Sequence, residues 1–261
     1  MIKIEDLHKS FNGNAVLKGV SLEIPKGEVI ALIGGSGEGK SVLLKHIAGL
    51  MKPDKGRVLV NGNDIASSRG RYLNALRSKL GFLFQGGALF DSMTVFENVA
   101  FPLKEKTRTP RKKVRDRVLR ELSNVGLSGS EEKFPSQISG GMVKRAALAR
   151  TLVVDPEILL FDEPTTGLDP LIGLAILKLI DSIHNRLGFT GVIVTHEVPR
   201  VFDIVDRVAF LNEGRVFAYY EPEEFMTSSE PELKEFLAGS LGRPHPDGPP
   251  LFMPCKGDES N

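Results

Sequence analysis

Short apolar runs recur along the chain, and their length and spacing indicate which elements they form. Near the N-terminus, MIKIEDL, VSLEI and EVIALI are β-rich runs separated by turn residues. Farther along, EILLFD and GVIVTH are continuous apolar runs with the helical pattern GLAILKLIDSIHNRLG between them. Continuous apolar strands that alternate with helices predict a parallel sheet covered on both faces, and therefore an α/β fold.

The middle and the end of the chain differ in pattern. Residues 94–153 are mainly helical in pattern, and RKKVRDRVLRELSNVGL within them is strongly amphipathic. Residues 221–241 are acidic and form a helical extension with one apolar stripe. This stripe consists of Leu233, Phe236, Leu237 and Leu241. Residues 242–261 are rich in Pro and Gly, so we expect a flexible tail unless a partner holds it.

Composition narrows the class of protein. A hydrophobic share of 41% over 261 residues is enough for a substantial core. The chain has 34 Lys and Arg against 33 Asp and Glu, and this balance argues against a nucleic-acid partner. Its one cysteine, Cys255, cannot form an internal disulfide. No apolar run approaches the roughly 18 residues that span a membrane, so another chain would have to cross it.

A phosphate-binding loop is the strongest chemical signal. The segment GGSGEGKS, residues 34–41, matches G-x-x-x-x-G-K-[ST] between an apolar strand and a helical pattern. Its glycines allow successive backbone N–H groups to approach phosphate closely. Lys40 can reach the β- and γ-phosphates, and the Ser41 hydroxyl can bind Mg²⁺. An ordinary glycine-rich turn is the alternative, and the flanking elements favour the phosphate loop.

Polar residues follow other apolar strands. ILLFDEP ends in Asp162, which can hold Mg²⁺, and Glu163, which can orient or deprotonate a water. His196 follows VIVT at the strand end where open α/β sheets bind ligands, which favours γ-phosphate sensing over a structural role. Gln85 also follows a strand, but Gln is common in loops, so by itself an ordinary loop residue is the favoured interpretation.

The order of these motifs resembles one family. The phosphate loop, Gln85, ISGGM, ILLFDEP, TTGLDP and VTHE follow the pattern of ABC-transporter ATP-binding subunits over about residues 1–220. The resemblance implies a P-loop NTPase of the ABC ATPase type with a mixed, largely parallel sheet. It also implies an N-terminal antiparallel β subdomain and a helical subdomain inserted at about residues 86–155. The expected activity is ATP hydrolysis, with ATP and Mg²⁺ bound.

Individual roles also follow from the resemblance. Phe11 matches the aromatic residue that stacks on adenine, and Gln85 the residue that contacts Mg²⁺ and senses the transmembrane partner. Glu163 and His196 match the catalytic residues, and Ser41, Gln85 and Asp162 the metal-binding residues. The implied nucleotide contacts are Phe11, Gly34, Gly35, Ser36, Gly37, Glu38, Gly39, Lys40, Ser41, Gln85, Ser139, Gly140, Gly141 and Asp169.

The segment QISGGMVKRAALAR, residues 137–150, indicates a second anion site. Ser139 and two glycines open a helix that carries Lys144, Arg145 and Arg150. In isolation, a structural helix that starts with glycines explains the segment about as well. The resemblance implies a signature motif that closes over ATP bound to a second copy in a head-to-tail dimer. Ile138 and Met142 depart from the common LSGGQ, and we expect them to modify activity without abolishing it.

Longer segments narrow the resemblance to Mla-type, MCE-associated phospholipid transporters. They are GKSVLLKHIAGLMKPDKGRVLVNG, FLFQGGALFDSMTVFENVAFPL and GGMVKRAALAR. The implied partners are a membrane permease, an MCE-domain lipid-binding protein and a STAS-domain subunit, at the cytoplasmic face of the inner membrane. Six apolar residues after Gln85 are candidates for permease docking or for packing inside the helical subdomain. They are Phe90, Met93, Val95, Phe96, Phe101 and Leu103.

Other functions remain open at this level. One alternative is the ATPase of a small-solute importer, such as one for amino acids. A soluble ABC protein of DNA repair or translation would generally show two cassettes or long coiled-coil insertions, and a P-loop kinase would leave SGG and His196 unexplained. The basic run at residues 104–120 has nine Lys or Arg and two acids, and is more typical of a solvated helix face than of a lipid or partner contact.

Overall fold

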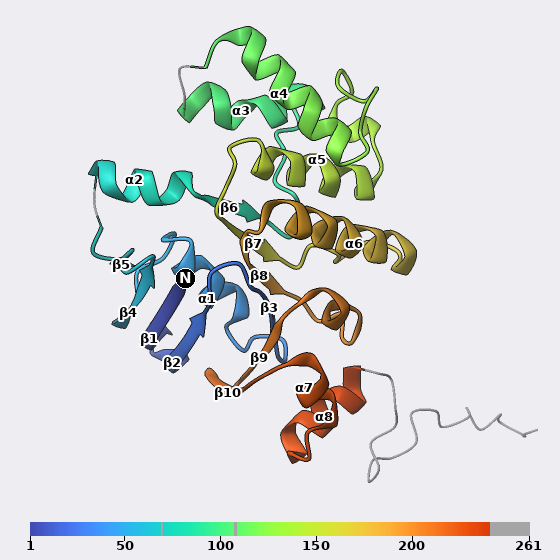
Figure 1. Ribbon diagram of the computed structural model, residues 1–261. Helices are drawn as coiled ribbons and strands as arrows, with labels where there is room; N and C mark the ends of the chain where they lie inside the picture. The colour runs from blue at the N-terminus through green and yellow to red at the C-terminus, as the bar shows by residue number, and fades with distance from the viewer. Residues whose placement is uncertain (69, 107–108, 241–261) are drawn as a thin grey trace, which may run out of the picture.

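The computed structural model describes residues 1–68, 70–106 and 109–240 (Figure 1). A six-stranded sheet forms its centre, in the order β10-β9-β3-β8-β7-β6. Its strands are β3 (Val29–Ile33), β6 (Leu80–Leu83), β7 (Ile158–Asp162), β8 (Thr190–Val194), β9 (Arg207–Asn212) and β10 (Arg215–Tyr220). The neighbouring pairs are parallel except for the β9–β10 hairpin. The predicted mixed, largely parallel sheet is confirmed.

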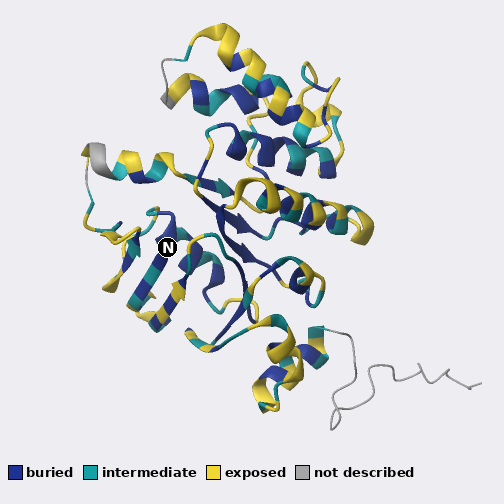
Figure 2. Cartoon of the chain, viewed as in Figure 1, coloured by how far each residue is buried: buried dark blue, intermediate teal, exposed yellow. Residues whose placement is uncertain are grey.

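Both faces of this sheet are buried, as the continuous apolar runs predict. Along β3, Val29, Ala31 and Ile33 belong to one hydrophobic cluster. Ile30 and Leu32, between them in sequence, belong to a second cluster on the opposite face. This alternation follows from the two-residue period of a strand. Figure 2 shows the buried strands between partly exposed layers.

An antiparallel sheet and two helices contribute to the second cluster. The sheet has the order β2-β1-β4-β5, with β1 (Ile2–Phe11), β2 (Asn14–Ile24), β4 (Lys55–Val60) and β5 (Asn63–Asp64). The helices are α1 (Lys40–Ile47) and α2 (Gly70–Ser78). This is the expected N-terminal antiparallel subdomain. Helix α2 was not predicted from the sequence. It contributes Leu73 and Leu76 to this cluster.

Three helices and a 3₁₀ turn form the layer at the top of Figure 1. They are α3 (Val95–Lys106), α4 (Arg111–Asn124), η1 (Pro135–Gln137) and α5 (Gly140–Leu152). On α4, Val114, Val118 and Leu122 recur every four residues and are buried. The cations at the start of this helix, at residues 111–113, are exposed, as expected for a solvated face. The domain boundaries near residues 86, 155 and 220 stay predictions.

The remaining helices are α6 (Pro170–Leu187), η2 (Arg200–Ile204), α7 (Pro222–Thr227) and α8 (Pro231–Ser240). The C-terminal extension thus contains two helices. Leu233 and Leu237 of α8 are buried, and the Phe236 ring lies 4.8 Å from that of Phe210, so the apolar stripe packs on its own domain. Leu241, Cys255 and the predicted tail at residues 242–261 lie outside the described residues. Within the described ranges, no helix has the length and apolarity to cross a membrane.

Candidate nucleotide-binding and hydrolytic site

Three chain segments meet at one edge of the central sheet. Strand β8 lies between β3 and β7 and is parallel to both, so the carboxyl ends of all three are adjacent. The phosphate loop follows β3, Asp162 ends β7, and His196 comes two residues after β8. Parallel strands of this kind bind ligands at their carboxyl ends. The predicted approach of the phosphate loop, Asp162 and His196 at one edge of the sheet is confirmed.

The phosphate loop depends on glycine at two close approaches. A Cβ on Gly34 would lie 2.2 Å from the backbone oxygen of Leu211. A Cβ on Gly39, whose φ is 96°, would lie 2.9 Å from side-chain atoms of Val16 and Leu17. Gly39 is also the N-cap of α1, and no side chain caps this helix. The first-turn N–H groups are therefore left for an anion.

Lys40 lies at the centre of the loop. Its Nζ donates hydrogen bonds to the backbone oxygens of Gly34 at 2.9 Å and Gly35 at 2.6 Å. Burial lowers the pKa of Lys40, and the carboxylates of Glu163, Glu38 and Asp162 act in the opposite direction. The ammonium group is thus held inside the loop by carbonyl oxygens, where a polyphosphate can exchange for part of that contact.

Ser41 and Asp162 are joined although 121 residues separate them. The Ser41 hydroxyl donates to Oδ1 of Asp162 at 2.7 Å. Asp162 is only 9% exposed. A carboxylate and a hydroxyl at the phosphate loop are oxygen donors of the type that Mg²⁺ prefers. The two side chains that were each predicted to bind Mg²⁺ therefore lie together, and their chemistry fits Mg²⁺.

Side chains from three segments of the chain surround the Glu163 carboxylate. Its Oε2 accepts hydrogen bonds from Nε2 of Gln85 at 2.9 Å and from Oγ1 of Thr166 at 2.8 Å. Its Oε1 lies 3.8 Å from Nδ1 of His196. The φ of Glu163 is 50°, a left-handed conformation that non-glycine residues rarely adopt and that occurs often at active sites. Thr166, within the quoted TTGLDP segment, is a contact that the sequence analysis missed.

These groups border a cavity of about 580 Å³. Its lining comes from the loop, α1, β1, β2 and the hydrolytic residues: Phe11, Val16, Gly34, Ser36, Gly37, Gly39, Lys40, Ser41, Val42, Glu163 and His196. Phe11 is 40% exposed and can receive a stacking base. Glu38 turns toward the β9–β10 turn instead, where its Oε2 accepts from the Gly214 N–H at 3.3 Å. Gly35 and Glu38 do not line this cavity.

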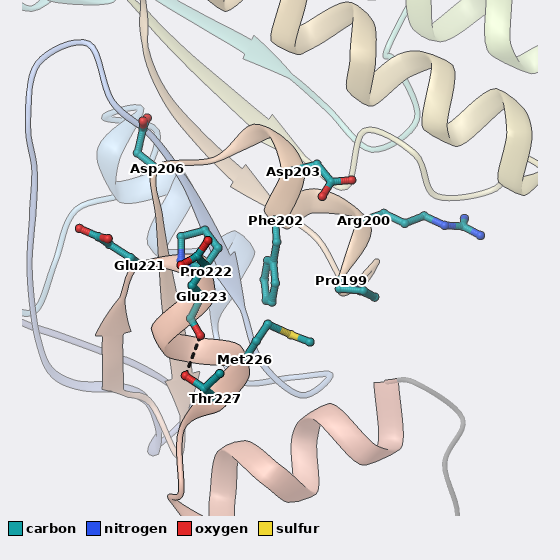
Figure 3. Close-up of a pocket in the computed structure, with 10 residues that line it drawn as sticks. All are labelled: Pro199, Arg200, Phe202, Asp203, Asp206, Glu221, Pro222, Glu223, Met226 and Thr227. Carbon is teal, nitrogen blue, oxygen red and sulfur yellow. Dashed lines mark hydrogen bonds between the residues drawn. The ribbon is translucent and has the colours of Figure 1, made fainter.

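A larger cavity, of about 810 Å³, lies between η2 and α7 (Figure 3). Four of its lining residues are acidic: Asp203, Asp206, Glu221 and Glu223. Arg200 is the one basic residue that lines it. This excess of carboxylates repels a polyphosphate. The smaller cavity at Lys40 is therefore the better candidate for a nucleotide site.

Comparisons with known proteins agree with this geometry. A family model described as ABC transporter matches residues 17–166. Over 259 residues, the chain is 38% identical to the intermembrane phospholipid transport system ATP-binding protein MlaF of Escherichia coli, and the match covers 99% of this chain and 94% of MlaF. This chain belongs to the ABC transporter ATP-binding family. It is an ATPase of the ABC type.

Another relative is named for the transport of a different substrate. The chain is 44% identical to a probable ribonucleotide transport ATP-binding protein of Mycobacterium leprae, covering 91% of this chain and 69% of that protein. It spans 66% of the length of the Mycobacterium tuberculosis protein of the same name. Among solved structures, a dimeric ATP-binding cassette, MJ0796, bound to ADP and Pi, is 33% identical with a TM-score of 0.78, covering 85% of this chain and 99% of that chain. CbiO1 of Clostridium perfringens is 34% identical with a TM-score of 0.79, covering 92% and 95%.

The signature residues of this ABC cassette lie outside its own nucleotide cavity. Ser139 caps α5, where its Oγ accepts from the Met142 N–H at 3.4 Å. A Cβ on Gly141 would lie 2.6 Å from the Ile172 side chain, so the start of α5 contacts the start of α6 closely. Asp169 caps α6 by accepting from the N–H groups of Leu171 and Ile172. Ser139, Gly140 and Asp169 are exposed and form a second surface, whereas Gly141 is buried behind it.

A shallow groove lies between β6, α3 and α5. Its volume is about 380 Å³, and Phe84, Phe90, Phe101 and Pro102 form part of its lining. Phe84 is 38% and Phe90 42% exposed. By contrast, two of the docking candidates are core residues: Val95 is fully buried and Leu103 is 4% exposed. Phe96 packs partly against the core and Met93 is half-buried.

Two of the cations in the signature helix do not form an anion site. The ammonium of Lys144 donates to the backbone oxygen of Gln85. Arg150 donates to the backbone oxygens of Gly87 at 2.7 Å and Ala88 at 2.6 Å. Both side chains bind the chain after β6, contrary to the expectation that they assist phosphate binding. Charge type alone did not reveal that their partners are carbonyl oxygens.

Proposed function

We propose that this chain is the ATP-hydrolysing subunit of an ABC transporter that moves phospholipid across or between membranes. The observation that carries the proposal is the convergence of Lys40, Ser41 and Glu163 at one cavity, with Asp162 hydrogen-bonded to Ser41 behind it. This site occurs in a chain similar to MlaF over nearly its whole length. The ATPase activity of the family would thus drive the transport of one substrate class, phospholipid.

The names of the relatives indicate two different transported substrates. The proteins called mkl are named for ribonucleotide transport, whereas MlaF is named for phospholipid transport. The alignment with MlaF spans 94% of that protein, and Met142 and the long segments around Gln85 also favour the Mla-type resemblance. Ribonucleotide transport is therefore the second candidate, and an amino-acid-type importer has less support.

The geometry supports a division of labour during hydrolysis. Lys40 and the loop N–H groups bind the β- and γ-phosphates of ATP, and Phe11 stacks on the base. Ser41, Asp162 and the side-chain oxygen of Gln85 would hold Mg²⁺, which would supply positive charge to neutralise the phosphate oxygens. Glu163 orients and deprotonates the attacking water, and Gln85 and Thr166 fix its carboxylate. His196 contacts the γ-phosphate from β8.

Each ATP is shared between two copies of the chain. Ser139, Gly140 and Gly141 do not line the cavity of their own chain, so they are free to close over the γ-phosphate bound to a second copy. The related cassette MJ0796 is a dimer with ADP and Pi bound. ATP then stabilises the closed dimer relative to the open one, and hydrolysis removes that preference.

The transporter's other subunits cross the membrane. The groove with exposed Phe84 and Phe90 is suited to a helix of a permease, because part of an apolar surface there is left uncovered. Through this contact the chain is held peripherally at the cytoplasmic face of the inner membrane. An MCE-domain lipid-binding protein and a STAS-domain subunit complete the proposed assembly.

The test uses the Glu163→Gln variant, which should bind ATP but stall before hydrolysis. We would trap the tagged variant with ATP in membranes, solubilise it in mild detergent, and identify co-purifying proteins and lipids by mass spectrometry. A polytopic permease, an MCE-domain protein and bound phospholipid are the expected result. A permease with a soluble binding protein and no lipid would overturn the substrate, and the absence of any membrane partner would overturn the transporter assignment.

A further inference from the structure

The segment from Gln85 to Ala88 has an unfavourable backbone conformation. Gly87 has a φ of 76° and Ala88 a φ of 49°, so two consecutive residues are left-handed. Alanine rarely adopts this conformation because its Cβ approaches the following carbonyl oxygen. Such geometry persists only where neighbouring groups impose it. The groups that impose it here come from α5.

Helix α5 holds this segment through two cations and through close packing. Arg150 donates to the backbone oxygens of the two left-handed residues, Gly87 at 2.7 Å and Ala88 at 2.6 Å. Lys144 donates to the backbone oxygen of Gln85. A Cβ on Gly87 would lie 3.3 Å from Val143 and 3.4 Å from Ala147, so α5 and the segment are in direct contact.

Lys144 is buried and Arg150 is partly buried. Lys144 is 6% exposed, and burial lowers its pKa while the Glu163 carboxylate opposes that change. Burial also lowers the pKa of the Arg150 guanidinium. A desolvated cation is unfavourable unless it is hydrogen-bonded, so these carbonyl contacts resist breaking. The contact between α5 and the segment is therefore firm.

The held segment connects three parts of the cassette. Nε2 of Gln85 donates to Glu163 at 2.9 Å. Ala88 and Arg150 line the groove with the exposed phenylalanines. The N-terminus of α5 follows Ser139, which belongs to the second, signature surface. One small contact region thus adjoins the hydrolytic carboxylate, the groove and the signature.

We propose that Lys144 and Arg150 are positioning residues that join α5 and residues 85–88 into one mechanical unit. A movement imposed at the groove then displaces the signature and Gln85 together, so that ATP closure and Glu163 alignment respond to the same movement. The identity of the groove's occupant rests on the proposed function. The joining of α5 to the segment does not, because it is a property of this chain alone.

The first test uses the isolated chain. In Lys144→Met and Arg150→Met, we expect amide hydrogen exchange of residues 85–90 to accelerate at least about tenfold, while exchange in the central sheet stays unchanged. The kcat for ATP should fall by a larger factor than KM changes, because the Gln85 side-chain amide orients Glu163 while the phosphate loop at Lys40 is left intact. Lys144→Arg should restore both, and Lys178→Met on the exposed face of α6 is the matched control. Unchanged exchange at residues 85–90 would overturn the proposal.

The second test uses the chain assembled with its permease in phospholipid vesicles. The ratio of permease-stimulated to basal ATPase rate should fall at least about threefold in Lys144→Met and recover in Lys144→Arg. A ratio equal to that of the wild type, with exchange accelerated, would overturn the coupling. If the wild type itself shows no stimulation, the proposed function fails, and the exchange experiment still decides whether α5 and the segment act as one unit.

Discussion

At the scale of single residues, the surroundings of Glu163 fix the orientation of its carboxylate. Its carboxylate accepts from Gln85 and Thr166, and its backbone is left-handed. A carboxylate that is already oriented needs little rearrangement when a water approaches. The strained backbone is consistent with selection for position over stability at this residue.

Replacing this carboxylate should separate binding from hydrolysis. In Glu163→Gln we expect kcat to fall by ~10²–10⁴, the usual contribution of a positioned general base, because the amide cannot take the proton. The Kd for ATP should change by less than about twofold, since Glu163 does not hold the phosphates. Rapid-mixing hydrolysis assays and nucleotide titration measure the two quantities.

The exposed Glu132→Gln is the control for loss of a carboxylate as such. Turnover of Glu163→Gln near the wild-type rate would remove Glu163 from the role of base.

At the scale of elements, the start of α6 combines a structural and a functional task. Oδ1 of Asp169 accepts hydrogen bonds from the backbone N–H groups of Leu171 at 3.1 Å and Ile172 at 3.0 Å. Pro170 follows at the first helical position. This explains why the helix begins three residues before the periodic apolar pattern that predicted it. Capping positions favour Asp and Asn for the same reason.

Removal of this cap should destabilise the fold in a way that asparagine prevents. Asp169→Ala should lower the free energy of unfolding by about 1 kcal/mol, which corresponds to roughly 2–4 °C in Tm for a chain of this size. Asp169→Asn keeps an oxygen acceptor and should retain most of the stability. Thermal unfolding followed by circular dichroism compares the two variants.

If Asp169→Asn is as stable as the wild type but hydrolyses ATP more slowly, the carboxylate also acts at the dimer contact. Equal loss of stability in both variants would contradict the capping role.

A second element-scale feature joins the two sheets. The Tyr219 hydroxyl of β10 donates to the backbone oxygen of Glu23 on β2 at 2.9 Å. Burial raises the pKa of Tyr219 from 10.0 to about 12. The folded state therefore binds this proton more tightly than the unfolded state does.

This difference predicts an alkaline loss of stability. The contribution of Tyr219 is complete below pH 10 and is lost as the pH rises toward about 12, because the unfolded chain releases the proton first. Tyr219→Phe should lack this part of the pH dependence, although it loses the hydrogen bond at every pH. Denaturant midpoints of both proteins at neutral and alkaline pH give the comparison. A constant difference between them across the alkaline range would contradict the buried ionisation.

At the scale of the whole molecule, the cassette presents half-sites on separate surfaces. The cavity at Lys40 lies at the carboxyl edge of the sheet, and the signature surface at Ser139 lies where α5 and α6 begin. The signature residues do not line the cavity of their own chain. In the proposed head-to-tail dimer, a second copy supplies the missing half.

A bulky cation at the signature should therefore leave ATP binding intact and block hydrolysis. We expect Ser139→Arg to bind ATP with a Kd within about twofold of the wild type, because its own cavity is unchanged. Its hydrolysis should stay low as protein concentration rises, whereas the wild-type specific rate should rise with dimer formation. Mixing it with Lys40→Ala should recover part of the activity, since each mixed dimer contains one complete site. Wild-type activity of Ser139→Arg alone would contradict the shared site.

Patterns in contiguous residues were sufficient to predict several parts of the site and of the sheet. The phosphate loop, the strand that ends in Asp162 and Glu163, and the buried strands are local patterns whose geometry follows from glycine placement and from apolar runs. Their convergence was also predictable, because parallel strands end at one edge. The side-chain pair Ser41 and Asp162 is the clearest case.

The partner that each polar side chain takes depends on how the chain packs in three dimensions. Glu38 belongs to the phosphate loop in sequence but binds the turn at Gly214, and Lys144 and Arg150 bind carbonyl oxygens instead of phosphate. Val95 and Leu103 lie in the core, whereas Phe90 stays exposed at the groove. These outcomes depend on which distant segments pack together, because hydrogen bonds and burial are set by neighbours in space. A residue's type and spacing specify what it can bind, and the packing of the chain selects among those partners.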